Sequence, residues 1–157
     1  MNRLQKLAKV ADALKQTASD PSTVIPYNAL GVGGQENCTL QVIANSVCRR
    51  PADVKALARE AVYNTLMLNL SKAGSVSAAI LLCKEARNVG WAVSVGFDPC
   101  VPGTGDTFLS DFAVGVGSGQ LYTGGLLAGE GVALCNRLLQ LSREDTDLTF
   151  VGRYFRR

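Results

Sequence analysis

The sequence lacks the patterns that identify several classes of protein. Its five cysteines are widely spaced and odd in number, and no two of them form a CxxC pair. No apolar run reaches the ~18 residues that a membrane-spanning helix needs. These absences argue against a zinc site, a secreted disulfide framework and a membrane span, and they favour buried free thiols in a reducing compartment.

Charge of one sign is not concentrated anywhere along the chain. The 16 basic and 13 acidic side chains give a net charge of +3, and the longest basic runs are the pairs Arg49-Arg50 and Arg156-Arg157. Nucleic-acid binding depends on a clustered basic surface. We therefore expect no nucleic-acid partner and no membrane partner.

Charged groups are scarce in a segment that is laid out like the rim of an active site. Residues 94–125 read as a strand, a Gly/Pro loop, a helix and a second strand, yet they contain no Lys, Arg or His. Their carboxylates are Asp98, Asp106 and Asp111. The segment has the layout of a catalytic loop without most of the groups that carry out chemistry.

What is present indicates a buried α/β protein. Apolar residues make up 47% of the chain and charged residues 18%, with 16 glycines, as is typical of parallel sheets covered on both faces. About two-thirds of the surface of an unfolded chain of this length is buried on folding, which allows one core. With no low-complexity linker, residues 1–157 are predicted to form a single domain.

Short β-branched or aliphatic runs and helical patterns alternate along the chain. Helix signals are Pro51 as a first residue, Ser75 as an N-cap, Gly90 as a terminator and Thr107 as another cap. Residues 1–19 fit a core-facing helix, with a mitochondrial presequence as the alternative. The spacing is that of βα units and predicts a parallel sheet or part of a barrel. The predicted strands are residues 22–27, 39–44, 65–70, 91–95 and 119–124.

Four segments, in the right order, resemble the C-terminal barrel of enolase, the lyase that dehydrates 2-phosphoglycerate to phosphoenolpyruvate. They are LMLNLSKAGSVSAAILLCKEARNVGWAVSV, GDTFLSDFAVGVGSGQLYTGG, CNRLLQLSRE and FVGRYFRR. The resemblance covers residues 41–157 well and residues 1–40 loosely. It implies an α/β fold that is a partial (β/α) barrel of the TIM type, similar to the C-terminal half of the enolase barrel.

The resemblance also implies where metal-binding and basic groups should stand at the strand ends. Where the family has a metal-ligating aspartate, this chain has Asn45 followed by Ser46, whose neutral oxygens are poor ligands for a hard divalent cation. The base lysine of the family falls on Asn69, which cannot accept the proton. Lys72 is expected to be a solvent-facing loop residue beyond the mouth, on the other face from position 69.

The phosphate-binding groups of the family are altered in the same way. In the Ser-His-Arg-Ser loop only the first residue survives, and the next three are Val95, Gly96 and Phe97. A substrate phosphate is then expected to meet Val95 and Phe97 where it needs charge-assisted donors. A second family lysine falls on Tyr122, which carries no positive charge near neutral pH.

These changes predict an inactive enolase-like fragment that acts as a structural or interaction subunit, without a cofactor. The alternative is a Mg-dependent phosphopyruvate hydratase completed by another chain. A partial barrel leaves strand edges open, so closure by the N-terminal segment, a homodimer or a larger assembly is expected, with the assembly favoured. The expected location is the cytoplasm, with the mitochondrion as the alternative.

Overall fold

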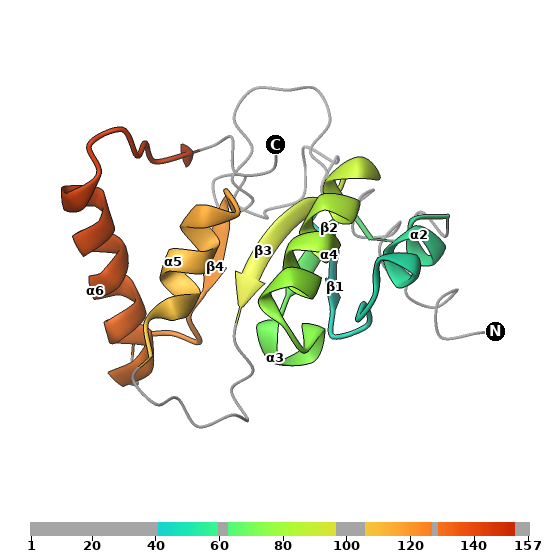
Figure 1. Cartoon of the computed structure of the whole chain (residues 1–157), viewed down its shortest axis with the longest axis horizontal. Coiled ribbons are helices and arrows are strands. Elements are labelled where there is room, and N and C mark those ends of the chain that lie inside the picture. The colour runs from blue at the N-terminus through green and yellow to red at the C-terminus, as the bar shows by residue number, and fades with distance from the viewer. Residues whose placement is uncertain (1–40, 60–62, 97–105, 127–128, 153–157) are drawn as a thin grey trace, which may run out of the picture.

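The computed structural model of the chain describes residues 41–59, 63–96, 106–126 and 129–152, in which strands and helices alternate (Figure 1). The strand expected at residues 22–27 and the helix expected at residues 1–19 lie outside these ranges. In chain order the elements are β1 Ile43–Asn45, α2 Pro51–Arg59, β2 Thr65–Leu68, α3 Leu70–Ala73, α4 Val76–Asn88, β3 Ala92–Gly96, α5 Phe108–Gly115, β4 Gln120–Tyr122 and α6 Gly129–Glu144.

The four described strands form one parallel sheet in the order β1-β2-β3-β4. Leu66 lies opposite Ala44 on one side and Val93 on the other, and Val95 lies opposite Leu121. Each connection between neighbouring strands contains a helix, as parallel pairing requires. The expected α/β class with a parallel sheet is therefore confirmed.

Helices cover one face of this sheet. Helix α4 packs against β2 and β3, α5 packs against β3 and β4, and α2 packs on the side of α4. Full burial of an aliphatic side chain stabilises a fold by about 1.5–3 kcal/mol, so this layer supplies much of the core. The strand residues buried under the helices are Ala44, Leu66, Leu68, Val93 and Val95, and the helix residues that meet them include Val54, Ala79, Leu82, Cys83, Ala86 and Phe112.

The opposite face of the sheet carries the alternate residues of each strand, with polar side chains such as Thr65, Ser94 and Gln120 beside apolar ones such as Ile43 and Met67. Gln41, two residues before β1, donates from Nε2 to Thr65 Oγ1 at 3.1 Å and to Gln120 Oε1 at 2.6 Å. Three strand spacings of ~4.8 Å would separate β1 from β4 by ~14 Å in a flat sheet. The two glutamine side chains meet because the sheet curves towards this face, which is the inner face of a barrel wall.

Local signals set most helix boundaries as expected. Pro51 begins α2, and Ser75 Oγ accepts a hydrogen bond from the Ala78 N–H at 3.1 Å at the start of α4. Past the end of α4, Gly90 adopts a φ of +78°, which favours glycine. Thr107 occupies the N-cap position of α5, as predicted, but its side chain makes no capping hydrogen bond. The Phe108 N–H donates instead to Asp106 Oδ1 at 2.8 Å.

Two of the predicted strands are too long, one is displaced by one residue, and one ends a residue later than predicted. The segment expected to be extended over residues 65–70 ends at Leu68, because the four-residue helix α3 begins at Leu70, and β4 covers only Gln120–Tyr122 of the predicted segment 119–124. β3 covers Ala92–Gly96 where residues 91–95 were expected, and β1 ends at Asn45, one residue past the predicted segment 39–44, whose first two residues lie outside the described ranges. The short helix α3 was not predicted from the sequence.

Helix α6 is attached to the sheet through α5. Ser110 Oγ donates to the Leu134 carbonyl at 2.9 Å, and Arg137 forms a two-pronged ion pair with Asp111, with distances of 2.6–3.1 Å. Arg137 also forms an ion pair with Glu144, about two turns further along α6, with 3.4 Å between the guanidinium nitrogen and the carboxylate oxygen. The Arg137 guanidinium holds the pKa of the Asp111 carboxyl below its ordinary value.

The described cysteines form no disulfide. Cys48 and Cys83 are buried and free, as expected, and Cys135 is free and partly exposed; Cys38 and Cys100 lie outside the described residues. Burial raises the pKa of Cys48 to about 11 and also raises the pKa of Cys83. None of the helices in the described ranges is long and apolar enough to cross a membrane.

Candidate site at the carboxyl ends of the strands

The carboxyl ends of the four parallel strands lie along one edge of the sheet, where a barrel enzyme carries its chemistry. The structure places the predicted positions there: Asn45 ends β1, Asn69 follows β2, Gly96 ends β3 and Tyr122 ends β4. The register sets Gly96 directly opposite Tyr122. Phe97 lies outside the described residues.

Asn45 and Ser46 are bonded to each other. Ser46 Oγ donates to Asn45 Oδ1 at 2.9 Å, and the Ser46 backbone has a φ of +63°. This left-handed conformation is uncommon for a residue other than glycine, asparagine or aspartate. The turn after β1 is therefore held in a sparsely populated conformation with its polar groups already engaged.

Lys72 does not occupy the place that the sequence predicted for it. It lies in α3 instead of a loop, it is partly buried, and its Nζ donates to Ser46 Oγ at 2.5 Å. The helical turn of α3 folds the side chain back over the mouth, whereas continued strand geometry would have carried it away. The prediction of a solvent-facing residue beyond the mouth is wrong, and the site contains a fixed ammonium group beside Ser46.

Asn69 is used as a helix cap. Its side chain is nearly buried, and its Oδ1 accepts hydrogen bonds from the Ser71 N–H at 3.1 Å and from Ser71 Oγ at 2.7 Å. Helix α3 closes at Gly74, whose N–H bonds to the Leu70 carbonyl at 3.1 Å with a φ of +79°. An asparagine two residues before a serine, with a glycine shortly after, is the sequence signal that would have predicted this cap.

Val95 and Gly96 face opposite sides of β3. Val95 is fully buried in the core under the helices, so a ligand at the mouth would not meet its side chain, and that expectation is wrong. Gly96 faces the mouth: a Cβ added there would lie 2.7 Å from Met67 Sδ and 3.3 Å from Tyr122 Cβ. A side chain at position 96 would therefore require the Met67 side chain to move and would press on Tyr122.

The carboxylates among the described residues are not gathered at the strand ends. No three His, Cys, Asp or Glu side chains in these ranges are close enough together to hold a metal ion. Asp53 Oδ2 accepts from the Arg49 and Arg50 N–H groups at 3.0 and 2.9 Å, which lowers the pKa of Asp53, and Asp111 pairs with Arg137.

The strand-end oxygens do not fit a magnesium ion. Those of Asn45, Ser46 and Asn69 are neutral, while Mg²⁺ prefers carboxylates in a near-octahedral shell. The ammonium of Lys72 is bonded to Ser46, so a divalent cation bound there would stand next to a positive charge and be repelled by it.

Comparison with known proteins identifies the relatives of the chain. Residues 35–157 match the family model described as "Enolase, C-terminal TIM barrel domain". An enolase of Mastigamoeba balamuthi is 41% identical over 81 residues, which cover 52% of this chain and 18% of that enolase. The chain thus aligns with about a fifth of the length of this curated relative, and the curved parallel sheet is part of a TIM-type barrel. The chain belongs to the enolase family, within its C-terminal barrel domain.

Proposed function

We propose that the chain is a noncatalytic member of the enolase family that acts as a structural or interaction subunit. One observation carries the proposal: the described side chains at the family's reactive positions are uncharged and are used in local packing and hydrogen bonds. Asn69 caps a helix, and Asn45 accepts a hydrogen bond from Ser46. Gly96 packs closely against the side chains of Met67 and Tyr122.

The reaction of the family makes demands that these groups do not meet. Removing a proton next to a carboxylate needs a base, and the intermediate that forms needs concentrated positive charge. An asparagine amide cannot take up the proton. Loss of a general base alone typically slows a reaction by roughly 10²–10⁴-fold, before any loss of metal binding is counted.

A second candidate function is phosphopyruvate hydratase activity in a complex with another chain. The observation in its favour is the 41% identity to an enolase over 81 residues. In that case a partner would have to supply the base, the metal ligands and the phosphate-binding groups. The neutral strand ends and the ammonium beside Ser46 favour the noncatalytic role.

The same proposal extends to partners and location. We propose a protein partner, no nucleic-acid partner and a cytoplasmic location, in keeping with the family and with the dispersed charge.

A turnover assay tests the proposal. Purified chain is incubated with 2-phosphoglycerate and Mg²⁺ while the absorbance of phosphoenolpyruvate is followed, with an active enolase at equal concentration as the positive control. The proposal predicts a rate at the level of the buffer blank. A rate within a hundredfold of the control would overturn it and favour the hydratase.

A further inference from the structure

We infer that Asn45 is a site of spontaneous chemical modification, at which the side-chain amide becomes a carboxylate through attack by the backbone nitrogen of Ser46. The inference goes beyond the proposed function and does not depend on it. It is carried by the residue that follows Asn45, by the hydrogen bonds that end on the Asn45 side chain, and by the exposure of the turn.

The sequence around Asn45 suits this reaction. Asparagine is among the chemically labile residues of proteins. Asn45 is the only asparagine of the chain that is followed by serine or glycine. A β-branched or long side chain at the next position crowds the backbone nitrogen that has to approach the amide carbon. In the described ranges the other asparagines are followed by Thr65, Leu70, Val89 and Arg137.

The side chain of Asn45 is turned towards Ser46. Ser46 Oγ donates to Asn45 Oδ1 at 2.9 Å, so the side-chain carbonyl lies next to the residue whose nitrogen attacks it. The ladder between β1 and β2 ends at Asn45, and the Ser46 N–H donates to none of the described residues. A nitrogen held in a ladder would first have to give up its hydrogen bond. The Ser46 nitrogen can therefore react without breaking the sheet.

The conversion needs only water as a co-reactant. The Ser46 nitrogen gives its proton to solvent and forms a bond to Asn45 Cγ, which places negative charge on Oδ1. The bond between Cγ and Nδ2 then breaks, and Nδ2 takes up a proton and leaves as ammonia. Water opens the resulting succinimide ring at either carbonyl. The product is aspartate or isoaspartate at position 45.

Lys72 and Ser46 are placed to stabilise the charge that develops. Lys72 Nζ donates to Ser46 Oγ at 2.5 Å, and Ser46 Oγ uses its own proton for Asn45 Oδ1. A hydrogen-bond chain that begins on an ammonium is stronger than one between neutral groups. Its last member ends on the oxygen that becomes negative. Donors fixed at a developing oxyanion accelerate this class of reaction.

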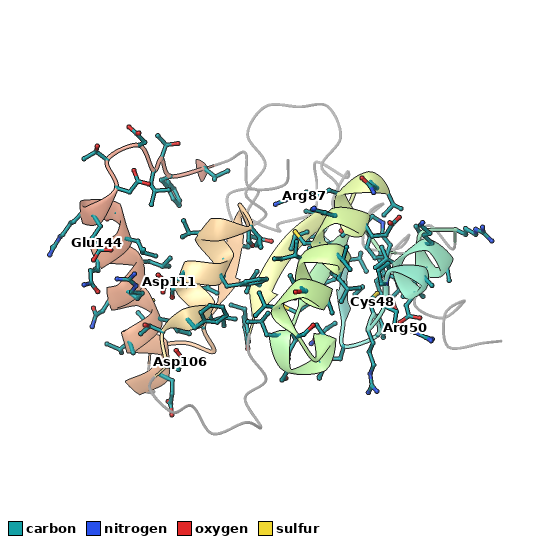
Figure 2. All side chains as sticks on the ribbon, in the orientation of Figure 1. Cys48, Arg50, Arg87, Asp106, Asp111 and Glu144 are labelled. Atoms are coloured by element: carbon teal, nitrogen blue, oxygen red, sulfur yellow. The ribbon has the colours of Figure 1, made fainter. Side chains whose placement is uncertain are left out.

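Solvent reaches the turn. Asn45 is exposed and Ser46 is partly exposed, so water has access for both the proton transfer and the ring opening. Cys48 and Arg50 belong to the loop that follows this turn (Figure 2), and Arg50 is also exposed.

Asn88 is an internal control within the same chain. It is exposed like Asn45, but it lies in α4, and the N–H of the next residue, Val89, donates to the Glu85 carbonyl at 3.2 Å. Asn88 therefore combines solvent access with a crowded and hydrogen-bonded nitrogen. We expect its amide to remain intact.

The product changes the charge of the strand end. The carboxylate forms two hydrogen bonds away from the Lys72 ammonium. It is expected to pair with Lys72, whose positive charge repels a divalent cation at the same place. The end of β1 is thus neutral when the chain is made and gains a negative charge as the reaction proceeds.

Peptide mapping by mass spectrometry tests the inference on the native chain, sampled during incubation in mildly alkaline buffer. Exchange of ammonia for water marks each converted asparagine, and Asn45→Asp supplies the reference for the aspartate product. Position 45 is expected to convert first. Position 88 should still be an amide when half of position 45 has reacted.

Two variants test the part played by the hydrogen bonds. Lys72→Met removes the ammonium and Ser46→Ala removes the last donor while keeping a small residue. Each is expected to slow conversion at position 45 by about tenfold, which is the rate equivalent of one hydrogen bond to a charged group. Lys84→Met, on the exposed side of α4, should leave the rate unchanged. Circular dichroism checks that all three variants fold.

The opposite result has a clear physical meaning. If these hydrogen bonds only hold the turn rigid, they protect the amide, and both variants convert faster than the native chain. A rate in Lys72→Met and Ser46→Ala that is unchanged or higher would overturn the inference, as would conversion at position 45 no faster than at position 88. The turnover assay is separate: an intact amide without turnover contradicts the modification alone, and conversion with turnover contradicts the noncatalytic role alone.

Discussion

At the scale of single residues, the most informative position is the glycine that ends β3. A Cβ at Gly96 would lie 2.7 Å from Met67 Sδ and 3.3 Å from Tyr122 Cβ. A larger side chain at this position would therefore have to displace the Met67 side chain and press on Tyr122. Restoring one family residue at a time should lower stability before it restores binding.

Gly96→Arg tests this point. Because overpacking a filled site forces neighbours out of their rotamers, we expect the free energy of unfolding to fall by about 1–3 kcal/mol. Gly115→Arg is the matched control, since a Cβ there meets nothing within 4 Å. Because Gly115 is the last residue of α5 and arginine favours the helix more than glycine does, this variant should be neutral or more stable by up to about 1 kcal/mol. Urea unfolding measures both; equal effects would contradict the packing account.

Asn69 should behave as a cap. Asn69→Ala leaves the Ser71 N–H without its acceptor and is expected to cost about 1 kcal/mol. Asn69→Ser keeps a capping oxygen and should recover most of that loss. If the serine variant is as unstable as the alanine variant in thermal or urea unfolding, capping is not what this side chain contributes.

Lys72 should contribute to stability through Ser46. Lys72→Met keeps the aliphatic stem and removes the ammonium, so we expect a loss of about 0.5–1.5 kcal/mol in the free energy of unfolding. Lys84 is exposed on α4, and Lys84→Met should be nearly neutral. A neutral Lys72→Met would show that the contact with Ser46 does not stabilise the turn.

The sequence was enough to predict which residues lie at the carboxyl ends of the strands, but it was not enough to predict the direction of every side chain there. The altered positions Asn45, Asn69, Gly96 and Tyr122 do meet at one edge, because parallel strands bring their carboxyl ends together. The predicted directions of Val95 and Lys72 are wrong. Strand alternation turns the Val95 side chain into the core under the helices. The unpredicted turn of α3 brings the Lys72 side chain to Ser46.

At the scale of elements, the sequence predicts the order of strands and helices well and their ends less well. Pro51, Ser75 and Gly90 act as expected because each works through its own backbone or side chain. The end of β2 depends on a competition between extending the strand and capping α3 at Asn69. Four-residue helices leave no periodic signal, so this outcome could not be predicted from apolar spacing.

The link between α5 and α6 should depend on pH. Arg137 lowers the pKa of Asp111 in the folded state, so the pair stabilises the fold above the ordinary aspartate range, and its contribution is lost as the pH falls through the lowered pKa. Asp111→Asn should therefore lower the midpoint of urea unfolding at pH 7, and the difference from the native chain should shrink below about pH 4.

Asp147→Asn is the control for this prediction. Asp111→Asn removes one negative charge from α5, and Asp147→Asn removes one from the exposed turn after α6, where the Asp147 carboxylate makes no ion pair with the other described residues. Its midpoint should track that of the native chain at every pH. A difference for Asp111→Asn that stays constant down to pH 2 would contradict the assigned ion pair.

At the scale of the whole molecule, the described residues form a section of barrel wall. Its outer face packs against the helices to form the core, and its described strand ends carry no carboxylate. The curvature of the sheet brings together residues that are far apart in the sequence, such as Gln41 and Gln120. Hydrophobic pattern and composition predict a parallel sheet. They do not predict which side chains on its inner face contact one another, because such contacts join residues that are distant in the sequence and leave no local signal.

The most direct test of the central claim is a calorimetric titration of the native chain with Mg²⁺ in the presence of 2-phosphoglycerate, with an active enolase as the reference. If the strand ends are neutral and Lys72 holds the positive charge beside Ser46, no saturable binding is expected at millimolar metal. Saturable, stoichiometric binding of Mg²⁺ that depends on the phosphorylated acid would contradict the account.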